Sequence, residues 1–142
     1  MTIAAILGNK GRDVIYVSPT QTVAEAIALL AKHRIGAVPV IDGGAVVGVF
    51  SERDVIHGLS AGDPTTLQRA VSETMTAPAH TVTLAEPVLS ALSLMTRRRI
   101  RHLPVVEDGR VIGIVSIGDL VKYRIEKIEA DAAAMREYIQ QA

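Results

Sequence analysis

The sequence predicts a mixed α/β (α+β) fold of two similar units, each in the order strand, helix, strand, strand, helix, and a long helix after the second unit. Three observations lead to this expectation. Two stretches of the chain repeat one another, short runs rich in Val and Ile alternate with amphipathic segments, and the C-terminal segment is strongly helical.

The duplication has a period of 65 residues. Shifting the chain by this amount aligns Val17–Val55 with Val82–Leu120 without a gap, and about a dozen positions are identical. Small units that cannot bury their apolar faces alone can bury them against each other, so the repeat predicts two halves that pack together. The identical pairs include Pro39 with Pro104, Gly48 with Gly113, Ser51 with Ser116, and Asp54 with Asp119.

The first helix of each unit has a recognisable start. Thr22 and Glu25 form a capping-box pattern, and apolar residues then follow at a spacing close to 3.6. In the second unit Pro87 stands where a first helical residue can be Pro. Both signals predict an amphipathic helix after a short opening strand.

The two strands that follow are marked by composition. The runs AVPVI and HLPVV predict strands, in which Pro39 and Pro104 are expected at an edge or a bulge. The turns DGGA and EDGR lead into the strands VVGVF and VIGIV. The second helix of each unit is expected to begin at Ser51 or Ser116.

The repeat divides the chain into residues 1–60 (first repeat), 61–78 (a connector with one weak helical stretch), 79–121 (second repeat) and 122–142 (C-terminal helix). Apolar residues along the last helix alternate spacings of four and three, which predicts a heptad seam. This seam packs either on its own domain or on a second copy of the chain. Its members are Val121, Ile125, Ile128, Ala132, Met135 and Ile139.

Composition excludes several classes of function. The 15 basic residues balance 15 acidic ones, so no net charge attracts the chain to nucleic acid or to an anionic membrane. The absence of Cys excludes disulfides, thiolate nucleophiles and sulfur ligands for metals. The opening segment lacks the features of a signal peptide, and no apolar run reaches the ~18 residues that span a bilayer. We therefore expect a cytoplasmic protein with no membrane partner.

The repeated Ser-x-x-Asp motif suggests a nucleotide site. A Ser at a helix N-terminus lies beside free backbone N–H groups that can bind phosphate. An Asp one turn later can accept both hydrogens of a ribose diol. A single copy is also explained by helix capping alone, but here the motif occurs twice, at Ser51–Asp54 and Ser116–Asp119.

With both motifs in register with the duplicated Pro-Val strands, the chain resembles the tandem cystathionine-β-synthase-type domain pair, also called the CBS pair or Bateman module. The resemblance covers about Gly11 to Val121. It implies two units packed sheet to sheet about a pseudo-two-fold axis, with two clefts that bind adenosine-bearing ligands such as AMP, ADP, ATP, NAD(H) or S-adenosylmethionine. It also implies a regulatory ligand, with no catalytic cofactor.

The resemblance implies roles for single positions. Asp54 and Asp119 would bind ribose, and Ser51 and Ser116 would lie beside the phosphate or sugar. Because each cleft draws on both repeats in this family, Asp54 would face Arg101–His102, and Asp119 would face Gly36–Ala37. Backbone groups at the adenine edge and residues that close the clefts are expected at Ala37, Val38, His102, Leu103, Lys10, Ile15 and His80.

The two clefts differ in charge. Arg53, Arg101 and His102 would lie near one phosphate region beside Asp54, whereas Lys10 is the obvious cation beside Asp119. We therefore expect stronger phosphate recognition at the Asp54 cleft.

Other functions have less support. The run TRRRIRH suggests nucleic-acid binding, but no stacking aromatic residues accompany it, and arginines at a helix C-terminus also complement the helix dipole. The four histidines lack metal-ligand spacing. Nucleotide hydrolysis by Asp54 and His102 is not supported by any catalytic motif. The sequence therefore predicts a non-enzymatic adenine-nucleotide sensor, a homodimer acting on an unknown effector protein. The alternative is a structural oligomerisation module with degenerate clefts.

Overall fold

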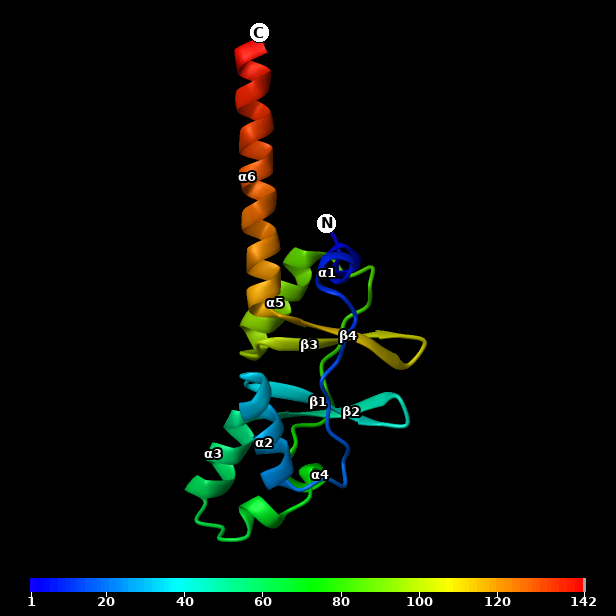
Figure 1. Ribbon diagram of the computed structural model, residues 1–142, viewed down its shortest axis with the longest axis vertical. Helices are drawn as coiled ribbons and strands as arrows, with labels where there is room; N and C mark the ends of the chain where they lie inside the picture. Colours follow the sequence, from blue (N-terminus) through cyan, green and yellow to red (C-terminus); the bar gives the residue numbers. More distant parts are fainter. Residues whose placement is uncertain (142) are drawn as a thin grey trace.

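The computed structural model describes residues 1–141 as four stacked layers, with helices at both ends and two small sheets between them (Figure 1). The first sheet pairs β1 (Ala37–Asp42) with β2 (Ala45–Ser51), and the second pairs β3 (His102–Glu107) with β4 (Arg110–Ser116). Both pairs are antiparallel. The sheets meet with β1 beside β3 and β2 beside β4. This arrangement confirms the predicted α+β class of two units packed sheet to sheet.

In the first unit, α2 (Val23–His33) begins as the capping box predicts, because the Thr22 hydroxyl accepts the Glu25 backbone N–H at 3.2 Å. After β1 and β2, α3 (Glu52–Ser60) follows directly in the chain, with Ser51 as its N-cap. One face of α2 packs against the sheet to form the first core. Its fully or nearly buried residues are Val17, Val23, Ala26, Leu30, Val38, Val40, Phe50 and Val71.

In the second unit, α5 (Val88–Arg98) is followed by β3, β4 and α6 (Ile117–Gln141). Pro87 is the N-cap of α5 instead of its first helical residue. The second core includes Val88, Met95 and Leu120. Helix α6 begins in this core and then projects far beyond the rest of the molecule (Figure 1).

The short opening strand of each unit consists of a single bridge. Val17 forms one parallel bridge with Val40, and Val82 forms one with Val105. Turns at 19–20 and 84–85 follow at once and end the pairing. Each sheet also has a bulge directly after the bridged residue of β1 or β3, one residue beyond the strand proline.

Two further helices, α1 (Ile3–Lys10) and α4 (Val71–Thr74), each pack against the core of the unit other than the one they precede in the chain, and we call them the exchanged segments. Helix α1 precedes the first unit, yet Ile3, Ile6 and Leu7 lie in the second core. Helix α4 precedes the second unit, yet Val71 lies in the first core. The short helix η1 (Thr66–Gln68) leads into α4, and these two helices lie in the segment expected to be weakly helical.

Each exchanged segment lies close to a glycine of the sheet it packs on, Gly48 of β2 for the α4 segment and Gly113 of β4 for α1. A Cβ at Gly48 would lie 2.6 Å from Met75 Sδ, and one at Gly113 would lie 2.9 Å from the Leu7 methyl groups. At Gly48 the Thr76 carbonyl oxygen would also be only 2.9 Å away, so a side chain there would push the backbone of that segment away, whereas at Gly113 the Leu7 side chain would have to shift. No helix described for residues 1–141 is long and apolar enough to cross a membrane.

Candidate functional site

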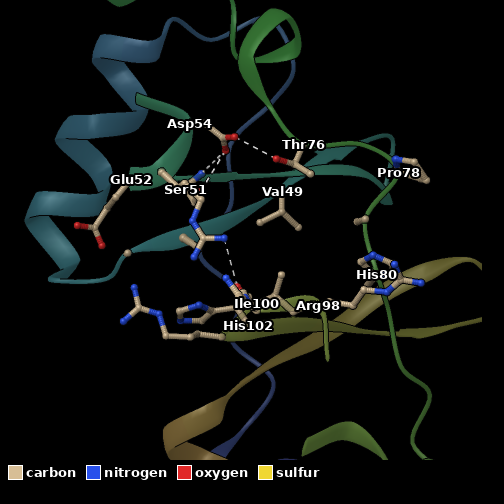
Figure 2. A pocket seen from close by; sticks show the side chains of 16 residues that line it. Val49, Ser51, Glu52, Asp54, Thr76, Pro78, His80, Arg98, Ile100 and His102 are labelled. Carbon is tan, nitrogen blue, oxygen red and sulfur yellow. Dashed lines mark hydrogen bonds between the residues drawn. The ribbon is translucent and has the colours of Figure 1, made fainter. Parts of the chain in front are cut away.

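A cavity of about 270 Å³ lies between the two units (Figure 2). This volume is close to the lower end of the usual range for small-molecule sites, ~300–1,000 Å³. The chain segments 36–37, 49–54, 76–80 and 98–102 contribute its lining. Of the residues singled out from the sequence, the cavity brings together Ala37, Ser51, Arg53, Asp54, His80, Arg101 and His102.

Asp54 lies in the first turn of α3 with its carboxylate held from two sides (Figure 2). Oδ2 accepts the Ser51 backbone N–H at 2.8 Å and the Ser51 hydroxyl at 3.2 Å. Oδ1 accepts the Thr76 hydroxyl at 3.0 Å. Each carboxylate oxygen can accept more than one hydrogen bond, so this carboxylate is positioned while it keeps the capacity to accept from a diol.

Positive charge predominates around the cavity. Its lining includes four arginines against the two carboxylates of Glu52 and Asp54. The Arg53 guanidinium spans the two units, because its Nη1 donates to the Arg99 carbonyl at 3.3 Å. Such a lining favours an anionic ligand. The arginines are Arg53, Arg98, Arg99 and Arg101.

The arginines of the second unit reach the cavity through a sharp reversal at the end of α5. Arg99 adopts a left-handed conformation, with φ 53°, and the Ile100 N–H bonds back to the Met95 carbonyl at 3.0 Å. This is the usual geometry of a helix C-terminus, although Gly is the residue most often found there. The reversal directs the chain from α5 into β3 along the edge of the cavity.

His102 is partly buried at the start of β3. Burial lowers the pKa of its imidazole below the ordinary value, and the charges of Arg101 and Lys10 lower it further, while Asp119 acts in the opposite direction. The ring is therefore neutral near pH 7, and an anion placed beside it would favour its protonation.

The equivalent of Asp54 in the second unit has a different environment. The Asp119 Oδ2 accepts the Ser116 backbone N–H at 2.8 Å, and the Ser116 hydroxyl accepts the Asp119 N–H at 3.1 Å. The Lys10 ammonium lies 2.5 Å from the same Oδ2 and donates to the Ile114 carbonyl at 2.9 Å. Asp119 is therefore already paired with a cation of its own chain.

This pairing changes the titration of Asp119. Partial burial alone would raise the pKa of its carboxyl, but the Lys10 hydrogen bond, the Ser116 N–H and the Lys10 charge together lower the pKa below the ordinary value. The neighbouring hollow, about 190 Å³, lies between α1 and α6 and is lined by Lys10, Asp119 and Tyr123 among others. Ser116 is not part of that lining.

Three other residues implied by the resemblance, Val38, Leu103 and Ile15, are not part of the cavity lining. Val38 and Leu103 are fully buried in the two cores, and Ile15 packs against the first core. Gly36 and Ala37 line the Asp54 cavity instead of the Asp119 hollow. The reason is that β1 and β3 lie side by side, so the segments that lead into them both border one cavity.

The structure also adds residues that the sequence did not indicate. Thr76 bonds to Asp54 from the segment before the second unit, outside the aligned repeat, so the 65-residue comparison could not find it. Arg98 and Arg99 were attributed to dipole complementation at a helix end, and they line the cavity as well. Among residues 1–141, no group of three or more His, Asp or Glu side chains is arranged to hold a metal ion.

Comparison with known proteins identifies the architecture. The family model for the CBS domain matches residues 10–61 and again residues 71–126. The chain belongs to the CBS domain family. It is 32% identical, over 98% of its length and 72% of the relative's, to the mitochondrial CBS domain-containing protein CBSX3 of Arabidopsis thaliana.

Solved structures of CBS domain proteins share this fold. The CBS-domain protein ATU1752 of Agrobacterium tumefaciens is 40% identical, with a TM-score of 0.82 over 87% of this chain and 99% of that one. The CBS protein PAE2072 of Pyrobaculum aerophilum, solved with AMP, is 28% identical, with a TM-score of 0.73 over 84% and 89%. The CBS pair of MJ0100, solved with 5′-methylthioadenosine and S-adenosyl-L-methionine, is 28% identical, with a TM-score of 0.77 over 89% and 98%.

Proposed function

We propose that this CBS pair is a regulatory module that binds an adenine nucleotide in the cavity beside Asp54 and has no catalytic activity of its own. The observation that carries the proposal is the placement of the Asp54 carboxylate, at the start of α3, in the same cavity as the arginines of both units. A carboxylate suits a ribose diol, and the arginines suit phosphate. Relatives of the same fold bind AMP or S-adenosyl-L-methionine, which supports an adenosine ligand.

The charge of the cavity favours phosphate-bearing ligands. We propose AMP, ATP or NAD(H) as the regulatory ligand, with ribose at Asp54 and Ser51, and phosphate towards Arg53, Arg101 and His102. Ala37 and His80 border the same cavity and would contact the remainder of the nucleotide. The Asp119 side is the weaker site in this proposal, because Lys10 already neutralises its carboxylate.

The second candidate is a structural oligomerisation module whose clefts bind nothing. The observation that favours it is the Lys10–Asp119 ion pair, which fills one potential ribose position with a side chain of the protein. The Asp54 side argues against it, because the described residues leave that carboxylate with hydroxyl and backbone N–H partners and no cationic one.

A ligand panel tests the proposal. Thermal unfolding of the full chain is measured with AMP, ADP, ATP, NAD, NADH, S-adenosylmethionine and GMP. A ligand present at about a hundred times its dissociation constant adds ~2.7 kcal/mol to the free energy of unfolding, which raises the midpoint by several degrees. Stabilisation by adenosine ligands, and less by GMP, is expected. No shift with any ligand, from protein shown by mass analysis to carry no bound nucleotide, would favour the structural module.

The matched variants are Asp54→Ala and Asp119→Ala. Loss of a charge-assisted hydrogen bond costs about 1.5–3 kcal/mol, so Asp54→Ala should weaken binding roughly tenfold or more. Asp119→Ala should leave the tighter binding event nearly unchanged. Equal affinity of Asp54→Ala and the parent would place the nucleotide elsewhere.

How occupancy is transmitted is a separate proposal. A ligand held by both units would change the angle between them, and a homodimer would pass this change to an effector protein, as yet unidentified. ATP incubated with the protein should remain intact, since a sensor returns its ligand unchanged. A cytoplasmic location stays a prediction from the sequence.

A further inference from the structure

Helix α6 has an apolar stripe that no described part of the chain covers. From residue 125 to residue 141 every position is exposed. The stripe is the heptad seam predicted from the sequence, and its large members are between 43% and 64% exposed. These large members are Val121, Ile125, Ile128, Met135 and Ile139, with the small Ala132 between them.

The projecting part of α6 has no neighbour that buries its apolar residues among the described residues. The 25 residues of α6 span about 37 Å, and most of that length lies beyond the body (Figure 1). In proteins, most helical stability comes from packing an apolar face against a neighbour rather than from intrinsic helix propensity. The exposed stripe therefore indicates a partner that packs along α6.

The charges beside the seam identify that partner. The seven positions of a heptad are labelled a to g, and the apolar seam lies at positions a and d. If Ile125, Ala132 and Ile139 are at position a, then Arg124 and Asp131 are at position g. Glu129 and Arg136 then occupy e positions. In a parallel coiled coil, each g residue lies beside the e residue five positions later on the other helix. Arg124 would meet Glu129 of the partner subunit, and Asp131 would meet Arg136 of the partner subunit, so both contacts join opposite charges.

We propose that α6 pairs with α6 of a second copy of this chain as a parallel, in-register coiled coil. The inference does not depend on nucleotide binding, because it rests on the exposure and charge pattern of α6 alone. It places the bodies of the two subunits at the same end of the paired helices.

An antiparallel pair of the same length is disfavoured by the same charges. Aligning all six seam layers in that direction sets Glu129 beside Glu129 of the partner subunit and Asp131 beside Asp131 of the partner subunit. It also sets Lys122 beside Arg136 of the partner subunit. All of these contacts join like charges, which destabilise a helix pair.

The body leaves room for the parallel partner. Leu120 is fully buried against the second core, and Tyr123 packs against the same core. Successive residues of a helix lie about 100° apart around its axis, so the seam that starts at Val121 points to the side of the body contact. A second helix can therefore lie along α6 without displacing the body.

The first experiment measures the mass of the full chain in solution by sedimentation, across low to high micromolar concentrations. We expect a species of twice the 15.1 kDa chain. Ile128→Glu, in the exposed seam, should shift the protein to the monomer while its nucleotide-free thermal unfolding stays cooperative. A parent that is monomeric at every concentration, or an Ile128→Glu dimer as tight as the parent, would overturn the proposal.

Charge exchange tests the direction of the pair. Arg136→Glu sets a carboxylate beside Asp131 of the partner subunit and should raise the dimer dissociation constant roughly fivefold or more. Mixing this variant with Asp131→Arg restores both cross-helix contacts, so the mixed dimer should be favoured over either homodimer. The matched control is Glu137→Arg, one position further along and outside the seam, which should behave as the parent. Tighter association of Arg136→Glu would indicate the antiparallel pair, because the new carboxylate would then face Lys122.

A single cysteine reports the register directly, because the chain has none of its own. Met135→Cys lies at a seam position that meets its own counterpart in a parallel, in-register pair. It should therefore form a disulfide-linked dimer on mild oxidation. Glu137→Cys, outside the seam, should crosslink far more slowly. Equal crosslinking of the two variants would contradict the parallel register.

Discussion

Lys10 and Asp119 form an ion pair of 2.5 Å that the first half of the molecule does not reproduce. The residue equivalent to Asp119 is Asp54, and its partner from the exchanged segment is the neutral hydroxyl of Thr76, at 3.0 Å. A duplicated motif therefore gives two carboxylates with different roles. Asp119 joins α1 to the second unit through Lys10, and Asp54 has no cationic side chain paired with it among the described residues.

Replacing Lys10 by Met should weaken the fold at neutral pH. The ion pair is partly exposed, so we expect a loss of about 0.2–1 kcal/mol in the free energy of unfolding. The pKa of Asp119 is lowered in the folded state, so its contribution is present above the ordinary Asp pKa and is lost as the pH falls through the folded value. Urea unfolding should therefore show a difference between parent and Lys10→Met at pH 7 that shrinks in acid. Lys32→Met, on the exposed side of α2, is the control and should show neither effect.

Removing cavity arginines should change phosphate recognition and spare adenosine. Arg101→Gln should weaken binding of AMP and ATP, with the larger loss for ATP, because the triphosphate carries more charge. Adenosine should bind the variant and the parent equally. Arg97→Gln is the matched control, since Arg97 lies in the last turn of α5, near Arg101 in the chain, but does not line the cavity. Calorimetric titration with AMP, ATP and adenosine measures these affinities. An equal loss of affinity for adenosine would mean that Arg101 shapes the site without contacting phosphate.

Binding of a phosphate-bearing ligand should depend on the protonation of His102. The imidazole has a lowered pKa in the folded protein, so without ligand its effect on stability is unfavourable once the pH falls below the ordinary value of 6.5. A bound phosphate reverses this by favouring the charged ring. The affinity for AMP should therefore rise as the pH falls towards the His102 pKa, with uptake of a proton. The AMP phosphate also titrates in this pH range and contributes to the pH dependence of binding in both proteins. His102→Gln should keep that contribution and lose the additional one that comes from the imidazole. Calorimetry in buffers of different ionisation enthalpy measures the proton uptake, and identical uptake in the two proteins would exclude His102.

Gly48 should not tolerate a side chain. A Cβ there would lie 2.6 Å from Met75 Sδ and 2.9 Å from the Thr76 carbonyl oxygen, so the backbone segment that bonds to Asp54 would have to move. We expect Gly48→Ala to cost about 1–3 kcal/mol in the free energy of unfolding and to weaken nucleotide binding. Gly8, inside α1, has open space around the same position, so Gly8→Ala should stabilise the protein by about 0.5–1 kcal/mol. Unfolding midpoints of the two variants that shift in the same direction would contradict this account.

Much of the fold was predictable because its signals are local. The Thr22 capping box, the turns after the proline-containing strands, and the Ser51 and Ser116 helix starts depend on neighbouring residues, and the structure has all of them. The extent of the opening strands was not predictable in the same way. Their apolar residues match a strand pattern, but only Val17 and Val82 find a partner before the chain turns.

The site was less predictable because it is assembled from distant segments. The spacing of Ser51 and Asp54 is visible in the sequence, and so is the run of arginines before His102. That Thr76 reaches Asp54, and that Gly36 borders the same cavity as Arg101, depends on how the sheets face each other. Lys10 and Asp119 are separated by 109 positions, so the expectation that Lys10 lies beside Asp119 came from the family resemblance and not from any periodicity.

The reciprocal placement of α1 and α4 makes the two halves interdependent. A fragment that ends before residue 71 would hold α1 without the core that α1 completes, and it would lack the Val71 side chain that completes its own core. The complementary fragment would have the opposite deficiency. Neither half is therefore a self-contained folding unit, and the two should unfold in a single cooperative transition.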